Sequence, residues 1–313
     1  MENKFIKINK KEMDSLIIYS KDRGILFREA KDEKINIRSI AKFVTSLACG
    51  ILIDKSNGDF TEDTLIHDIL KDKVNISNKK NLSKLKEIRV KDCLTHTMGY
   101  RDIILMSKDI GNLDKDRLLE YALSYPLYSK PGEEFLYSNA GYYVLSAVMQ
   151  EYLAYDLYNF INDNIFSKLG IINPRWDRYG NYLVGASKLY LCAEDLLKLG
   201  KIVIDDGVYD GERIVSSEWT GKISSRFYKN DKDYIDRTYL SDDYYGYGIW
   251  TGKDGVTYAS GSGGQYLIFL KKEGIIIVAC NGGDSNKVPA IKNQLDSIIK
   301  SLREEWNGLQ LLN

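Results

Sequence analysis

The chain has 313 residues, of which 44% are hydrophobic and 28% are charged, as is typical of a globular protein. Lysine and arginine together number 44, as do aspartate and glutamate, so the formal net charge is zero. This balance disfavours nucleic acids and anionic membranes as partners, because proteins that bind them usually carry a basic excess.

The N-terminal segment is charged and lacks the apolar core of a signal peptide. We therefore expect a cytoplasmic protein, with a trimmed form of a secreted protein as the alternative. No apolar run reaches the roughly 18 residues of a membrane-spanning helix, so we expect no such helix. The sequence gives no indication of the oligomeric state.

Two short strands are predicted first, at Leu16–Tyr19 and Gly24–Arg28, joined by a polar turn. An apolar series at helical spacing follows, and it predicts a buried helix that begins near Ser39. The first turn of a helix leaves backbone N–H groups without partners. The Ser39 N–H is therefore suited to stabilising an oxyanion.

Ser39 and Lys42 are three residues apart and would share one face of this helix. Burial disfavours the charged form of a lysine. A neutral Lys42 could take the proton of Ser39, whose hydroxyl is a poor nucleophile unaided. The competing interpretation is that Ser39 is only a helix cap.

The same Ser-x-x-Lys spacing recurs at Ser77/Lys80, Ser83/Lys86 and Ser297/Lys300. The first two pairs lie in a polar stretch that we interpret as exposed. The third lies inside a predicted helix, where no helix terminus is available. The context therefore favours Ser39 and Lys42.

The middle of the chain is mostly helical in pattern. Helices are predicted at Arg89–Leu94, Lys115–Tyr125, Ala140–Glu151, Asp156–Leu169 and Ala193–Asp205. Between them, Tyr137-Ser-Asn139 would add a second titratable group to Ser39 and Lys42.

His96 allows a different hypothesis, a Ser-His-Asp triad with Asp102 or Asp92. The Gly-x-Ser-x-Gly turn that often presents such a serine is absent. We therefore expect His96 to be a hydrogen-bonded polar residue at a helix–loop junction.

From Tyr245 the hydrophobic period changes to that of strands. Strands are predicted at Tyr247–Thr251, Val256–Ser260, Tyr266–Leu270 and Ile275–Cys280. An amphipathic helix at about Lys287–Glu304 follows them. Aromatic residues of the run 244–250 could line a pocket, although packing is the commoner role of such residues.

Strands at both ends with helices between them predict an α+β fold, in which one antiparallel sheet forms from both chain ends and helices flank it. We expect a single domain, 1–313. It would comprise an α/β lobe of about 1–54 and 241–313 and an inserted, mostly helical lobe of about 55–240. A cleft between the lobes is the natural place for a site.

Cysteine and histidine are too scattered to suggest a metal site. The four cysteines lie far apart in apolar surroundings, so we expect them to be buried free thiols. They are Cys49, Cys93, Cys192 and Cys280. The two histidines have no metal-ligand spacing, and no glycine-rich nucleotide-binding loop is present. We expect neither a metal ion nor another cofactor.

In their order and spacing, several motifs resemble those of the serine β-lactamase and penicillin-binding-protein superfamily, in particular its class C β-lactamase-related branch. The resemblance covers nearly the whole chain. It rests on Ser39-Ile-Ala-Lys42, Leu94-Thr-His-Thr-Met-Gly99, Pro131-Gly-Glu-Glu-Phe-Leu-Tyr137-Ser-Asn139, Tyr245-Gly-Tyr-Gly-Ile-Trp250 and Gly261-Ser-Gly-Gly-Gln265.

The resemblance implies a β-lactamase/transpeptidase-like fold and a serine hydrolase that works through an acyl-enzyme. Its substrate would be a small-molecule or peptide-like ester, amide or β-lactam. Ser39 would be the nucleophile, and Lys42 and Tyr137 the proton-transfer pair, with the base undecided between them. Asn139 would orient Lys42 or the substrate amide. The substrate-binding segment would comprise Ser262, Gly263, Gly264 and Gln265.

The last motif departs from the superfamily, whose members commonly carry a lysine or histidine there. The segment Ser260–Gln265 contains no cation, and Ser262 can donate only a neutral hydrogen bond. This weakens the case for β-lactams and carboxylate-ended peptides and leaves esters and neutral amides. It also motivates an alternative, a non-catalytic or very slow-turnover binding or sensor protein on the same fold. A backbone N–H near Gly264 or Gln265 could complete the oxyanion site.

Overall fold

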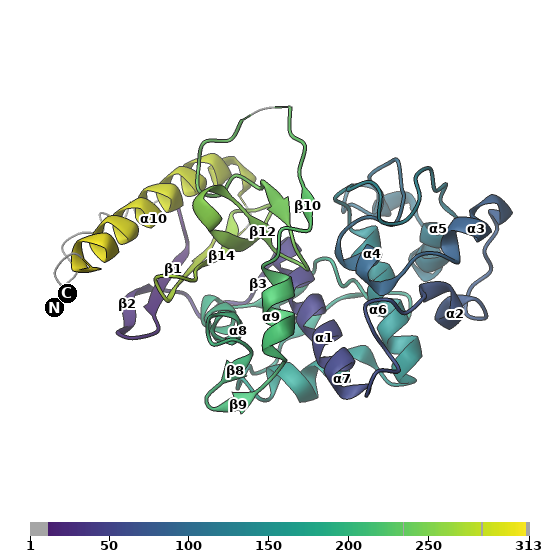
Figure 1. Cartoon of the computed structure of the whole chain (residues 1–313), viewed down its shortest axis with the longest axis horizontal. Coiled ribbons are helices and arrows are strands. Elements are labelled where there is room, and N and C mark those ends of the chain that lie inside the picture. Colours follow the sequence, from purple (N-terminus) through teal and green to yellow (C-terminus); the bar gives the residue numbers. More distant parts are fainter. Residues whose placement is uncertain (1–11, 234, 283, 311–313) are drawn as a thin grey trace.

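A computed structural model describes residues 12–233, 235–282 and 284–310 of the chain. An eight-stranded antiparallel sheet crosses one half of the molecule (Figure 1). Its strands, in spatial order, are β10 (Tyr228–Lys229), β11 (Tyr244–Tyr245), β12 (Trp250–Thr251), β13 (Thr257–Gly261), β14 (Gln265–Leu270), β15 (Ile275–Cys280), β1 (Ser15–Ser20) and β2 (Gly24–Glu29).

The sheet joins the two ends of the chain because β1 pairs with β15, with Ser15 opposite Cys280 and Ser20 opposite Ile275. Strands β14 and β15 are buried along their whole length. Such continuous apolar runs are expected for strands that are covered on both faces. The predicted antiparallel sheet from both chain ends is therefore confirmed.

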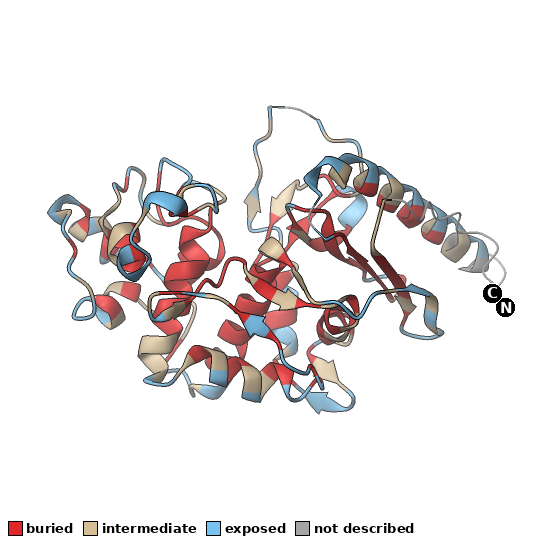
Figure 2. Ribbon diagram, turned by 180° about the vertical axis from the view of Figure 1, so that it is seen from behind, coloured by how far each residue is buried: buried red, intermediate tan, exposed pale blue. Residues whose placement is uncertain are grey.

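Helices cover the two faces of the sheet. On one face, Ile18 and Ile277 pack with the apolar residues of α10 (Val288–Gln310). On the other, Ile17 and Ile276 pack with α8 (Ala193–Ile204). Successive residues of a strand point to opposite faces, so adjacent isoleucines pack into the hydrophobic clusters on opposite faces of the sheet. Figure 2 shows this buried layer between the helices.

A helical region lies beside the sheet, built around α1 and α6, which are buried on nearly all sides. The remaining helices are shorter and surround these two (Figure 1). The helices here and next to the sheet are α1 (Ala41–Lys55), α2 (Ile66–Leu70), α3 (Leu82–Leu85), α4 (Val90–Leu94), α5 (Leu118–Ser124), α6 (Ala140–Leu153), α7 (Leu157–Ile161) and α9 (Ser217–Ile223).

Short strands also occur in the region that we expected to be mostly helical. Apart from β10, which belongs to the large sheet, they form two hairpins and, together with the earlier strand β3, one three-stranded sheet. The strands are β3 (Ile35–Asn36), β4 (Arg175–Trp176) and β7 (Leu189–Leu191), then β5 (Arg178–Tyr179) with β6 (Tyr182–Leu183), and β8 (Val208–Tyr209) with β9 (Glu212–Arg213).

One predicted strand was wrong in part. The segment Tyr247–Thr251 is not continuous, because its first residues form the turn between β11 and β12. Gly248 in this turn has a φ of +103°, and a Cβ on it would lie 3.1 Å from the Cα of Phe43. The turn runs close to α1, and residues with a Cβ rarely adopt the positive φ of Gly248, so the glycine favours a break in the strand at this point.

Two predicted helices are also less regular than expected. The segment Asp156–Leu169 divides into α7 and a π-helical turn at Asn162–Phe166. The segment Lys115–Tyr125 begins with a 3₁₀ turn before α5. The other predicted strands and helices differ from the structure mainly at their ends, where assignment is least definite.

The two-lobe division of the chain stays a prediction. Helix α8 lies within the range expected for the helical lobe, yet it packs against β15 and β1 of the sheet. All four cysteines are free, and they are buried except for the half-buried Cys192. Within the described residues, no helix is both long and apolar enough to cross a membrane.

Candidate active site

Ser39 lies in a 3₁₀ turn, Arg38–Ile40, directly before α1, and its side chain is half-buried. The cap positions of this turn and of α1 are Ile37 and Ile40, and neither cap involves a side-chain hydrogen bond. The helix-cap interpretation of Ser39 is therefore wrong. Among the described residues, no acceptor is found for the Ser39 backbone N–H. This N–H is therefore available to an oxyanion, as the sequence suggested.

Lys42 is completely buried in the first turn of α1. Its Nζ lies 3.2 Å from Ser39 Oγ, 2.8 Å from Asn139 Oδ1 and 3.3 Å from the carbonyl oxygen of Ala186. Burial lowers the pKa of Lys42 from 10.5 to about 7, because the charged amine loses its hydration. A large share of this lysine is therefore neutral at neutral pH.

The partners of Lys42 decide what a neutral amine can do here. A neutral amine has two N–H donors and one lone pair. An amide oxygen and a backbone carbonyl can only accept hydrogen bonds, so Asn139 and Ala186 take the two donors. The lone pair is then left for the Ser39 hydroxyl, the remaining neighbour.

Asn139 is fixed in the orientation that this arrangement needs. It directly precedes α6 and is buried. Its Nδ2 donates to the carbonyl oxygen of Leu105 at 3.0 Å, which directs Oδ1 to Lys42. This orientation is consistent with the predicted role of Asn139 in orienting Lys42.

The Ala186 carbonyl is a part of the site that sequence reasoning missed. Its loop is held against α1 because Thr45 Oγ1 donates to the carbonyl oxygen of Gly185 at 2.7 Å. Gly185 has a φ of +63°, and a Cβ on it would lie 2.2 Å from Ser146 Oγ, so glycine is required there. Because the group that contacts Lys42 belongs to the backbone, no residue type could have revealed it.

Tyr137 also lies close to Lys42, and it precedes α6 in the chain. Lys42 Nζ is 4.7 Å from the centre of its ring, and the ring stacks on Trp250 with centroids 5.3 Å apart. Burial raises the pKa of Tyr137, and a hydrogen bond with Ser39 opposes this effect in part. The structure therefore brings Ser39, Lys42, Tyr137 and Asn139 together, with Tyr137 neutral at neutral pH.

The predicted substrate-binding segment forms the turn from β13 to β14. Ser262 is exposed, whereas Gln265 is buried. The Gly264 N–H donates to the Gly261 carbonyl at 3.1 Å, and the Gly263 N–H donates to Gln265 Oε1 at 3.1 Å. These atoms hold the turn together, so a contribution of Gly264 N–H to the oxyanion site has no support here. Substrate binding by this segment stays a prediction.

His96 does not behave as expected. It is buried, it has a φ of +60°, and both ring nitrogens lack a hydrogen-bond partner within the described residues. The expectation of a hydrogen-bonded histidine is wrong because aromatic rings, rather than acceptors, surround it. The centroid distances to Phe135, Tyr137, Tyr142 and Tyr245 are 6.0, 4.5, 5.2 and 4.9 Å. Burial lowers the pKa of His96 well below 6.5.

The triad hypothesis for His96 loses its basis for the same reason. A triad histidine must hydrogen bond both the serine and a carboxylate. His96 bonds neither Ser39 nor Asp92 or Asp102 in the described part of the chain. The roles predicted for Lys42 and Tyr137 in proton transfer stay a prediction.

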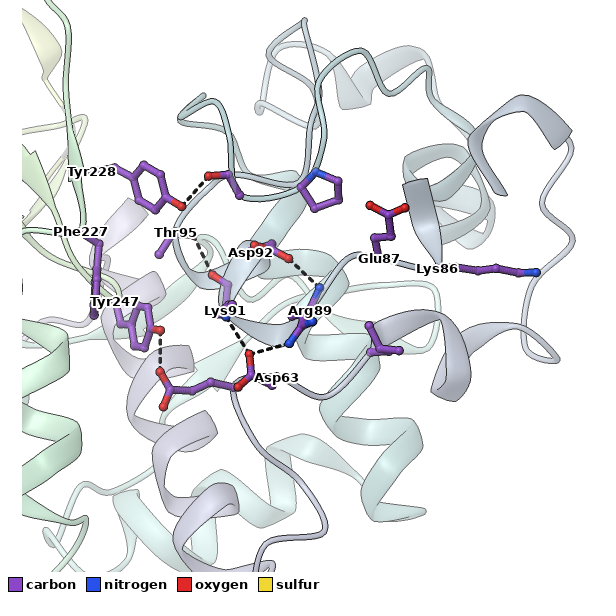
Figure 3. A pocket seen from close by; sticks show the side chains of 14 residues that line it. Asp63, Lys86, Glu87, Arg89, Lys91, Asp92, Thr95, Phe227, Tyr228 and Tyr247 are labelled. Atoms are coloured by element: carbon purple, nitrogen blue, oxygen red, sulfur yellow. Dashed lines mark hydrogen bonds and ion pairs between the residues drawn. The ribbon is translucent and has the colours of Figure 1, made fainter. Parts of the chain in front are cut away.

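A separate cavity of about 850 Å³ opens between the helical region and the edge of the sheet (Figure 3). Tyr228 and Tyr247 lie on one side, and the ion pairs of Asp63 with Arg89 and Lys91 lie on the other. Ser39 does not line this cavity. Tyr247 thus does line a cavity, whereas Trp250 packs on Tyr137. No group of three metal-ligating side chains occurs in residues 12–233, 235–282 and 284–310.

Comparisons with known proteins identify the family and the fold. A family model described as Beta-lactamase matches residues 17–299. A search of curated proteins finds no match.

Solved structures share the fold at low identity. An octameric penicillin-binding protein homologue from Pyrococcus abyssi is 19% identical, with a TM-score of 0.69 over 90% of this chain and 72% of that one. A penicillin-binding protein from Bacillus halodurans is 18% identical, with a TM-score of 0.67 over 89% and 95%. EstCE1, a hydrolase with promiscuous acyltransferase activity, is 15% identical, with a TM-score of 0.68 over 90% and 93%.

Proposed function

The chain belongs to the Beta-lactamase family, and from this premise we propose that it is a serine hydrolase that forms an acyl-enzyme on Ser39. The observation that carries the proposal is the position of Lys42. Its amine is buried and lies 3.2 Å from Ser39 Oγ. Two acceptors, Asn139 Oδ1 and the Ala186 carbonyl oxygen, take its N–H donors. This arrangement supports Lys42 as a neutral base for the Ser39 hydroxyl.

The first half of the reaction follows from these groups. Ser39 Oγ forms a bond to the substrate carbonyl carbon while its proton passes to Lys42 Nζ. The oxyanion that develops accepts a hydrogen bond from the Ser39 N–H. The bond to the leaving alcohol or amine then breaks, and the leaving group takes a proton from Lys42 directly or through Tyr137. Lys42 returns to its neutral form.

The second half releases the acyl group. Water attacks the acyl carbon, a proton passes back through the same groups, and the bond to Ser39 Oγ breaks. Tyr137 is suited to relaying protons because it hydrogen bonds Ser39 and remains protonated at neutral pH. Lys42 and Tyr137 lie close enough for their titrations to be coupled, so the base belongs to the pair rather than to one residue.

The substrates that we propose are esters, with neutral amides and β-lactams as further acyl donors. EstCE1, a hydrolase with promiscuous acyltransferase activity, has the same fold, which is consistent with transfer of an acyl group to Ser39. The alternative is a binding or sensor protein that acylates without turnover. The lack of a charged side chain in Ser260–Gln265 is the observation that favours this alternative.

The deciding experiment is intact-protein mass spectrometry after incubation with benzylpenicillin or, separately, para-nitrophenyl acetate. We expect one acyl group per chain in the wild type and none in Ser39→Ala. Steady release of para-nitrophenol by the wild type would exclude the sensor alternative. A stable adduct without turnover would establish it.

The chain offers a matched control in Ser297→Ala, because Ser297 and Lys300 have the same spacing as Ser39 and Lys42 but lie on the exposed side of α10. Ser297→Ala should keep both the adduct and the turnover. Equal labelling of wild type and Ser39→Ala would contradict the proposed nucleophile.

A further inference from the structure

Arg38, the residue before Ser39, is half-buried and makes no side-chain hydrogen bond, ion pair or ring contact within the described part of the chain. Every other arginine there makes at least one, apart from the exposed Arg237. A guanidinium is always charged and carries five N–H donors. Partial burial without an acceptor leaves these donors free for an anion from outside the chain.

The backbone of Arg38 is fixed in an unusual conformation. Its φ is +53°, in the left-handed region, which costs a residue other than glycine about 1 kcal/mol. Its N–H donates to Asn36 Oδ1 at 2.9 Å, which holds this conformation. Strained residues of this kind persist where the surrounding structure fixes them, and they gather at functional sites.

The start of the Arg38 side chain is fixed as well. A Cβ on Gly261, at the end of β13, would lie 2.9 Å from the Cβ of Arg38. The side chain therefore begins in contact with the strand that faces Ser39. Ser39 is the next residue, and adjacent Cα atoms are about 3.8 Å apart, so a side chain as long as that of arginine can extend from here to an acyl group on Ser39.

Arg38 differs from Lys42 and from the segment Ser260–Gln265 in carrying a permanent positive charge. The segment Ser260–Gln265 has no charged side chain. Lys42 is a poor anion receptor because it is completely buried and its pKa is lowered to about 7. Arg38 therefore supplies a permanent positive charge beside Ser39, and Lys42 does not.

We propose that Arg38 binds a carboxylate of the substrate, so that the site prefers acyl donors with an anionic group a few bonds from the carbonyl that Ser39 attacks. This inference rests on the proposed function and adds the charge of the substrate to it. It differs from the sequence-based expectation of neutral substrates, because it places the cation at the residue before Ser39 rather than in the last motif. Arginine suits this role because its planar fork pairs with both oxygens of a carboxylate.

The test compares two esters with the same leaving group and similar acyl length, para-nitrophenyl hydrogen glutarate and para-nitrophenyl pentanoate. We expect the full chain to have the higher kcat/KM for the glutarate ester, and added salt to reduce this preference. Arg38→Gln should lower the glutarate-to-pentanoate ratio about tenfold or more, the usual effect of losing a charge-assisted hydrogen bond. Arg38→Lys should restore part of the ratio, because it keeps the charge without the fork.

Arg237→Gln is the matched control, since it removes the same charge from the other arginine without a partner in the described residues. It should leave the ratio unchanged. The proposal is overturned if Arg38→Gln has the wild-type ratio, or if it lowers the rates of both esters equally, which would indicate a purely structural role.

A binding measurement separates this proposal from the proposed function. Monomethyl glutarate should bind the wild type in isothermal titration calorimetry, and Arg38→Gln should lose this binding. If neither ester is turned over but this binding depends on Arg38, the anion site stands and the hydrolase proposal fails. If the pentanoate ester is turned over but neither binding nor ester preference depends on Arg38, only the anion site fails.

Discussion

Lys42 Nζ lies 2.8 Å from Asn139 Oδ1, so a neutral amide oxygen contacts a lysine that is completely buried. An amide oxygen binds the amine without holding it in the charged form as firmly as a carboxylate would. Burial lowers the pKa of Lys42 to about 7, and the neutral amide does not oppose this effect as a carboxylate would. The first three predictions below concern groups that are buried without a charged partner.

The rate of Ser39 acylation should fall as the pH drops through about 7. The pKa of Lys42 is lowered to about 7, and the base is active only above this value, in its neutral form. Asn139→Asp places a carboxylate at the same distance and raises the pKa of Lys42. The acid limb of the pH–rate profile should then move to higher pH, with a rate at pH 7 lower by about tenfold or more, since one pKa unit is a factor of ten.

Asn159→Asp, a change at an exposed position on α7, controls for the added charge and should keep the wild-type profile. Stopped-flow measurement of para-nitrophenol release across the pH range checks this prediction. If the acid limb of the pH–rate profile has the same midpoint in Asn139→Asp as in the wild type, Lys42 is not the base.

Lys42→Met should raise the melting temperature although it abolishes turnover. The unfolded chain keeps the lysine proton up to its ordinary pKa of 10.5, whereas burial lowers the pKa of the folded chain to about 7. Folding at pH 7 therefore costs free energy, roughly a few kcal/mol by the linkage relation, and this cost vanishes as the pH approaches 10.5. The gain from methionine should be largest near pH 7 and shrink at higher pH.

Thermal unfolding of Lys42→Met across this pH range gives the result, with Lys300→Met as the control. Lys300 is exposed on α10 and pairs with Glu304, so its replacement should change the melting temperature little. A lower melting temperature for Lys42→Met would mean that the buried amine stabilises the fold.

His96→Phe should reduce the loss of folding stability that occurs as the pH falls. Burial lowers the pKa of His96 well below 6.5, so the unfolded chain binds a proton near pH 6.5 that the folded chain does not. The wild type should therefore lose stability as the pH falls below about 6.5. Phenylalanine keeps a ring among the four aromatic neighbours and removes both unpaired nitrogens.

The difference in melting temperature between pH 8 and pH 5, measured by calorimetry, should shrink in His96→Phe. Asp92 and Asp242 have raised pKa values that act in the opposite direction, but they are present in both proteins. His67→Gln, at the other histidine of the chain, should keep the wild-type difference. The same difference in wild type and His96→Phe would contradict the assignment.

Gly261→Ala should slow acylation of Ser39 by about tenfold or more, because misplacement of reacting groups by an ångström has effects of this size. The added Cβ would lie 2.8 Å from the carbonyl oxygen of Ile37, a backbone atom just before the turn that carries Ser39. That turn must move away from β13 to make room. Gly111→Ala is the control, because nothing lies within 4 Å of its Cβ. Acylation by Gly261→Ala at the wild-type rate would contradict the prediction.

Most helices and strands, and the proximity of Ser39 and Lys42, were predictable from the sequence. Ser39 and Lys42 meet because three residues on one helical turn are local geometry, which the sequence determines directly. The strands β1, β14 and β15 and the helix α10 follow from hydrophobic period in the same way. The interruption at Gly248 was not predictable, because it depends on where α1 lies.

The sequence by itself determined the family, the sheet built from both chain ends and the residue types of the site. Only the tertiary structure decided that a carbonyl at Ala186 completes the surroundings of Lys42, that His96 is enclosed by rings and that Arg38 has no partner within the described residues. These features depend on contacts between segments far apart in the chain. They involve backbone groups and packing, which leave no periodic signal in the sequence.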